Sequence, residues 1–121
     1  MPLNQNFDLA QGDVFAFSLT VSDYTGAPLS IAGAAVLMAA NDSTGTQVFE
    51  IGTVTGDIVL TNPSAGQMLV TIPGSATAGV TFAAGTDAVY LKYDVRMTLA
   101  QNTYTLAWGM LTVHEPVAPC P

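Results

Sequence analysis

Hydrophobic and polar residues alternate most regularly at positions 90–99, YLKYDVRMTL. Successive side chains of a strand point to opposite faces, so this stretch is predicted to be a strand with one buried face and one face near water. The buried face is predicted to carry Leu91, Tyr93, Val95, Met97 and Leu99. A short break at 101–103 leads into a second alternating stretch at 104–113, and the two stretches are expected to form a hairpin.

Shorter alternating or apolar stretches, separated by Gly, Asn, Asp and Pro turns, predict the other strands. These expected strands lie at 7–10, 13–21, 31–40, 47–53, 58–61 and 68–72. The segment 73–85 is predicted to be a crossover loop with one helical turn at 75–78. About seven to eight short strands joined by such turns indicate an all-β fold, an immunoglobulin-like antiparallel β-sandwich.

The length of 121 residues is that of one domain. The β-sandwich domain is expected at 7–114. A flexible N-terminal arm is expected at 1–6 and a C-terminal tail at 115–121.

The predicted strand at 31–40, IAGAAVLMAA, is apolar at nearly every position. An apolar strand without alternation is typical of burial on both faces. Since a sandwich covers only one face of each sheet, a second subunit would have to cover the other face. Val36 and Met38 are therefore candidate interface residues. The alternative is a strand whose outer face carries only small alanines.

Charged residues make up only 9% of the chain and hydrophobic residues 50%. Such a composition exposes neutral or apolar surface, which more often faces a partner than water. The alternative is a secreted domain coated with Thr and Ser. No signal peptide is visible, so we expect synthesis in a cytoplasm.

The formal net charge is −7, from nine acidic and two basic residues. Binding to nucleic acid or to an anionic membrane surface needs clustered cations, so neither partner is expected. The longest apolar run, 31–40, is about half of a bilayer span.

Residues that could perform chemistry are few. His114 is the only histidine, and nothing in the sequence fixes it near a nucleophile or in a zinc site. We therefore expect neither an enzyme nor a cofactor. Cys120 is the only cysteine, so an internal disulfide is impossible and an interchain disulfide is a minor alternative.

Calcium is the metal that the sequence fits best. Asp23, Asp42, Asp57 and Asp87 lie in predicted turns, where their oxygens could converge. No pair has the spacing of a dedicated calcium loop, however, and aspartate also bonds to the backbone of its own turn.

One face of the last predicted strand would be rich in aromatic residues. If Leu111 and Val113 point inward, the opposite face forms an outward stripe beside Tyr90. That face would carry Tyr104, Leu106, Trp108 and Met110. Trp and Tyr are favoured anchors of protein interfaces, so the stripe is a candidate subunit contact. Stacking on a carbohydrate and simple filling of the core by Trp108 are the alternatives.

Several short motifs, spread over nearly the whole chain, resemble a family of phage proteins. They are an aromatic-Asp-x-x-x-Gly-Asp opening at 7–13, Asp-x-x-Gly-x-Pro at 23–28, Gly-Ala at 33–34, Asn-Pro-x-x-Gly at 62–66, Tyr-Asp-Val at 93–95 and Gly-x-Leu-x-Val at 109–113. The chain thus resembles small tailed-phage virion proteins similar to the immunoglobulin-like N-terminal domain of phage upper-baseplate proteins. It departs from them in its low charge and in having Gln-Asn-Thr at 101–103 where relatives usually have Asp-Gly.

The resemblance implies a non-enzymatic virion structural protein without catalytic residues. Its expected role is a baseplate or tail adaptor module that self-associates, with a trimer favoured, and attaches other virion proteins. It would be made in the host cytoplasm and end in the virion. A capsid decoration or head-fibre protein is the alternative, and a carbohydrate-binding module is the second alternative.

Overall fold

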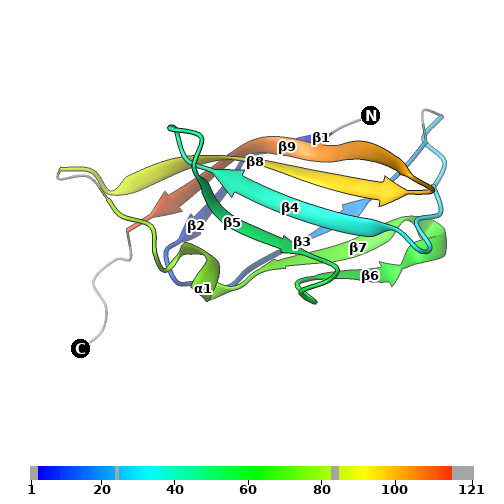
Figure 1. Cartoon of the computed structure of the whole chain (residues 1–121), viewed down its shortest axis with the longest axis horizontal. Coiled ribbons are helices and arrows are strands. Elements are labelled where there is room, and N and C mark those ends of the chain that lie inside the picture. The colour runs from blue at the N-terminus through cyan, green and yellow to red at the C-terminus, as the bar shows by residue number, and fades with distance from the viewer. Residues whose placement is uncertain (1–2, 24, 83–84, 116–121) are drawn as a thin grey trace.

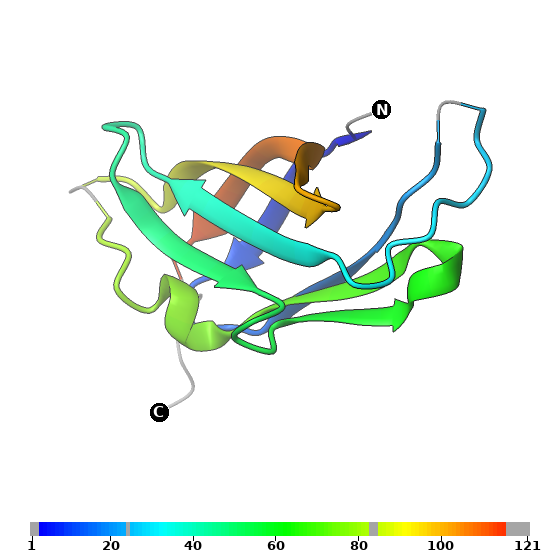
Figure 2. The same ribbon diagram turned by 45° about the vertical axis from the view of Figure 1, so that its right-hand side comes forward.

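Two β-sheets packed face to face form the protein (Figures 1 and 2). The computed structural model describes residues 3–23, 25–82 and 85–115. The large sheet has six strands, in the order β1-β9-β8-β4-β5 with β2 also paired to β9, and the small sheet has the order β3-β7-β6. The elements are β1 (Leu3–Asn4), β2 (Phe7–Ala10), β3 (Phe15–Thr20), β4 (Ala35–Asn41), β5 (Gln47–Gly52), β6 (Ile58–Asn62), the 3-10 turn η1 (Pro63–Ala65), β7 (Gln67–Ile72), α1 (Gly74–Thr77), β8 (Ala88–Leu99) and β9 (Asn102–His114).

The strand order confirms the predicted immunoglobulin-like sandwich. In that fold strands B, E and D form one sheet and strands C, F and G form the other. Here β3, β7 and β6 take the first set of places, and β4, β8 and β9 take the second. The chain crosses between the sheets after β7, through a segment that contains α1, as the composition of that segment predicted.

The prediction of a flexible N-terminal arm is wrong for residues 3 and 4, because they form β1 and pair in parallel with the middle of β9. The next residue, Gln5, is fixed as well, because its backbone carbonyl accepts a hydrogen bond of 2.6 Å from the Tyr93 hydroxyl. Gly109 of β9 makes room for this segment, since a Cβ there would collide with the Gln5 carbonyl. The polar sequence of this segment did not predict a strand, because the hydrogen bonds of a ladder are made by backbone groups and not by side chains.

The expected interface role of Val36 and Met38 is also wrong. Both side chains point into the core and are 2% and 0% exposed. Strand β4 alternates like the others, but three of its outward positions, Ala35, Leu37 and Ala39, are apolar as well. That is why the sequence shows an unbroken hydrophobic run. The outer face carries alanines, as the alternative interpretation held, together with the exposed Leu37.

One lateral seam of the sandwich, between β2 and β3, is closed by aromatic rings. The Phe7 ring stacks on Phe17 with centroids 4.5 Å apart, and it contacts Phe15 at 5.3 Å and Tyr93 at 5.7 Å. These rings join the two sheets near the start of β3. Strand β2 thus closes this side of the sandwich near the start of β3.

Candidate functional site

The predicted interface residues separate into three groups in the structure. Val36 and Met38 lie in the core. Tyr90, Trp108 and Met110 lie on the outer face of the large sheet, and Tyr104 and Leu106 line a cleft at one end of the sandwich. The expected stripe on β9 is therefore not one surface.

A β-bulge in β9 causes this separation. The pairing of β8 with β9 shifts where Val95 opposes Ala107 and Arg96 opposes Thr105, which leaves Leu106 as the extra residue. Beyond the bulge the alternation reverses, so Tyr104 opposes the buried Met97. A strict period of two cannot continue through a bulge.

The expected inward direction of Leu111 and Val113 is confirmed, since both are fully buried. Trp108 lies on the opposite side and is 50% exposed, so it does not fill the core. Tyr90 and Met110 are exposed on the same side, at 58% and 37%. Two of the three aromatic candidates thus remain on one outward surface.

We use the name outer face for the outward side chains of β4, β5, β8 and β9. Residues directly opposite each other in a sheet lie on the same face. One row across the strands contains Glu50, Ala39, Asp94 and Trp108, and its neighbours contain Leu37 with Arg96 and Lys92 with Met110. Tyr90 follows beyond Lys92.

The outer face holds both cations of the chain, Lys92 and Arg96. The Arg96 guanidinium contacts the Asp94 carboxylate at 2.9 Å, and both side chains are partly exposed. Glu50 supplies a second negative charge, and Asp8 lies at the edge of the sheet beside His114. The other acidic residues lie outside the four strands of the outer face. They are Asp13, Asp23, Asp42, Asp57, Asp87 and Glu115. The face is nearly neutral on a strongly acidic molecule.

The outer face is hollowed above Ala39. The depression has a volume of about 340 Å³ and is walled by Leu37, Glu50, Lys92 and Arg96. Trp108 stands in the same cross-strand row, beyond Asp94. One surface therefore carries both a large aromatic projection and a recess beside a small side chain.

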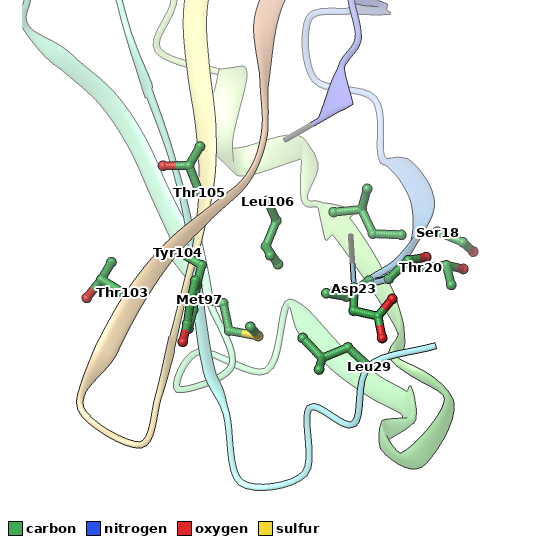
Figure 3. A pocket seen from close by; sticks show the side chains of 12 residues that line it. Ser18, Thr20, Asp23, Leu29, Met97, Thr103, Tyr104, Thr105 and Leu106 are labelled. Carbon is green, nitrogen blue, oxygen red and sulfur yellow. The ribbon is translucent and has the colours of Figure 1, made fainter. Parts of the chain in front are cut away.

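A larger cleft, which we call the end cleft, opens where β3 and β9 diverge (Figure 3). Its volume is about 710 Å³. Leu29, Met97 and Leu106 point toward one another across it, while Ser18 and Thr20 turn their side chains away. Leu19, Val21 and Tyr104 complete the apolar wall. The sequence predicted none of this, because the cleft depends on the bulge and on the missing strand beside β3.

Two of the aspartates considered for calcium, Asp23 and Asp42, accept hydrogen bonds within their own turns. Asp23 Oδ1 accepts from the backbone N–H groups of Thr25 and Ala27 and from the Thr25 hydroxyl. Asp42 repeats the arrangement with Thr44 and Thr46. The hydrogen bond from the threonine hydroxyl is the main reason that the pKa of each aspartate is lowered. No group of three or more His, Cys, Asp or Glu side chains converges among the described residues.

His114 lies at the end of β9, where its Nε2 is 3.1 Å from Asp8 Oδ1. No Ser, Thr or Cys of the described residues hydrogen-bonds to it. Cys120, the candidate for an interchain disulfide, lies outside the described residues. In the part of the chain that the structure describes, no helix has the length and apolarity to cross a bilayer.

No protein-family model and no curated protein sequence matches the chain.

Proposed function

We propose that the chain is a non-enzymatic structural protein of a tailed-phage virion, a baseplate or tail adaptor module that self-associates and attaches other virion parts. The observation that carries the self-association is the outer face. It is the surface on which this acidic molecule is nearly neutral and exposes its only tryptophan. The positive and negative charges of this face balance, so two copies can meet there without net repulsion, whereas their other surfaces repel.

The geometry of the outer face favours two copies facing each other. Trp108 of one copy can enter the hollow above Ala39 of the other, and a twofold axis satisfies both contacts at once. The twofold axis then runs along β8, and the long Lys92 and Arg96 side chains can reach the Asp94 carboxylate of the opposite copy diagonally. A trimer, as expected from the sequence, would need a second surface complementary to this one.

The virion setting is supported by the sequence motifs. Their residues shape the fold, because Gly66 ends η1 in a left-handed conformation and packs against the Leu29 carbonyl, where a Cβ would be only 2.6 Å away. Asp23 and Gly26 form one of the aspartate turns. The motifs thus support a shared scaffold rather than a shared chemistry, which suits an adaptor.

A carbohydrate-binding module is the second candidate function. The observation that favours it is the exposure of Trp108 and Tyr90 on one sheet face, since exposed aromatic rings can stack on sugars. A capsid decoration protein would use the same surfaces as a tail adaptor.

The mass of the purified chain, measured by size exclusion with light scattering, tests self-association. We expect an oligomer that dissociates in Trp108→Ala. Tyr104→Ala is the matched control, because Tyr104 is exposed to a similar degree, 47%, but lies at the end cleft. A monomeric wild type, or equal loss of the oligomer in both variants, contradicts the proposal. Glycan binding by a monomer, lost in Trp108→Ala, supports the carbohydrate alternative instead.

Immunogold labelling of particles of the phage that encodes the chain tests the virion setting. Label at the tail end supports an adaptor, and label over the capsid supports decoration. Unlabelled particles contradict both.

A further inference from the structure

The end cleft continues the seam that the aromatic rings close. Along β9, the N-terminal strands β1 and β2 pair with residues 107–114, and no strand of the described residues lies beside the edge of β9 before Ala107. On the opposite side, β7 is the only strand paired with β3 in the part of the chain that the structure describes. In the immunoglobulin sheet of strands A, B, E and D, strand A lies beside B. Here β1 and β2 pair with β9 instead, so no described strand occupies the place beside β3.

The edge of β3 presents backbone groups for pairing. The Val21 N–H donates to Gly66, on the β7 side, and successive residues of a strand direct their backbone groups to alternate sides. The N–H and C=O groups of Ser18 and Thr20 therefore face away from β7. They have no hydrogen-bond partner among the described residues. Such an edge is a template for an added strand.

The end cleft adds side-chain specificity to this edge. A strand paired with β3 would direct every second side chain inward, onto the wall of Leu106, Met97 and Leu29 (Figure 3). Asp23 is the only charged residue of the lining. Its Oδ1 accepts the hydrogen bonds of its own turn, and its Oδ2 takes no part in them.

We propose that the end cleft binds an extended segment of another protein, which adds a strand antiparallel to β3. Backbone hydrogen bonds to Ser18 and Thr20 hold the segment, and its apolar side chains at alternate positions fill the cleft. An antiparallel segment begins beside Asp23, so a basic residue at its start is favoured. A second copy of this acidic chain lacks such a segment, because its two cations lie on the outer face. The end cleft and the outer face are different surfaces, so binding at the cleft is independent of the proposed self-association.

Titration of the 15N-labelled full chain with the capped hexapeptide Lys-Val-Thr-Val-Thr-Val, followed by NMR, tests the proposal. We expect the amide signals of Ser18, Thr20 and Leu106 to shift most, with saturation below a peptide concentration of about 1 mM. A peptide of the same composition with consecutive valines, Lys-Thr-Thr-Val-Val-Val, should bind at least about tenfold more weakly. Shifts located elsewhere, absence of saturation, or equal binding of the two peptides would overturn the proposal.

Two matched changes at one position test the backbone pairing. Thr20→Pro removes the N–H that faces away from β7 and should weaken peptide binding about tenfold, whereas Thr20→Val keeps the N–H and should leave binding within about twofold. If Thr20→Pro does not fold, a peptide N-methylated at the amides that would face β3 gives the same test with the unchanged protein. Equal affinity of the methylated and unmethylated peptides would overturn the proposal. Retained peptide binding in a monomeric Trp108→Ala variant would show that the two surfaces act separately.

Discussion

Met38 and Leu37 are neighbours in β4 with opposite environments, since Met38 is fully buried and Leu37 is 42% exposed on the outer face. Met38→Ala is expected to lower the free energy of unfolding by about 2–5 kcal/mol, because it removes a buried side chain and leaves a cavity. Leu37→Ala should cost less than about 1 kcal/mol. Urea denaturation of the two variants measures the difference. Equal losses would contradict the assignment of the faces.

Tyr93 should make stability depend on alkaline pH. Burial raises the pKa of its phenol to about 12, and the value in an unfolded chain is about 10. The folded state thus favours the neutral phenol. This contribution to stability is complete below about pH 10 and is lost as the pH rises through about 12.

Tyr93→Phe removes this titration, so its free energy of unfolding should fall less than that of the wild type between about pH 10 and 12. Near neutral pH the variant should be less stable by about 0.5–1.5 kcal/mol, because the Gln5 carbonyl loses its donor. Denaturation curves over the pH range measure both effects. Parallel pH profiles would contradict the buried position of the phenol.

At the scale of residues, the sequence predicted burial well where a strand alternates without interruption. The inward side of β8, with Leu91, Tyr93, Val95 and Met97, is buried as expected. The prediction failed for Tyr104, because the position of a bulge depends on the partner strand and not on local sequence. It also failed for β4, where apolar residues occupy both faces.

At the scale of elements, the β8–β9 hairpin has a turn that its sequence does not favour. The turn residues are Ala100 and Gln101, with φ of 52° and 69°, and not the expected 101–103. Positive φ at both central positions of a two-residue turn favours Asn-Gly. Replacing the pair by Ala100→Asn and Gln101→Gly should raise the free energy of unfolding by about 1–2 kcal/mol, because the left-handed conformation strains other residues.

Thermal and urea denaturation of this double variant measure the gain. A second double variant, Ala100→Val with Gln101→Val, is the control. It should destabilise the protein, since β-branched residues tolerate positive φ least. A double Asn-Gly variant less stable than the wild type would contradict the turn geometry.

Most elements could be predicted because their turns carry strong local signals. The aspartate turns at 23–27 and 42–46 are two such signals, as each fixes its own conformation through one carboxylate. Strand β1 could not be predicted, since its two residues carry no alternation and depend on backbone pairing with β9.

At the scale of the whole molecule, the placement of charge should control self-association. Lys92→Gln and Val54→Asp make the net charge more negative by the same amount, but Lys92 lies on the outer face and Val54, 96% exposed, lies in the turn after β5. Lys92→Gln should weaken self-association about two- to fivefold, as loss of an exposed ion pair does, and Val54→Asp should have little effect.

Sedimentation equilibrium at low salt measures the two affinities, and added salt should reduce the difference between the variants. Equal weakening by both substitutions would mean that net charge, and not the outer face, governs association. The sequence gives the net charge, but only the register of the strands places both cations on one surface.

The parallel pairing of β2 with β9 has a mechanical consequence. Tension applied through the chain pulls β2 from its first residue and β9 from its last, in opposite directions along the same axis. The hydrogen bonds between the two strands are then loaded in shear and must break together, whereas a hairpin pulled at its open end loses its bonds one after another. Force transmitted along the chain thus meets its strongest resistance at the junction of the first and last strands of the sandwich.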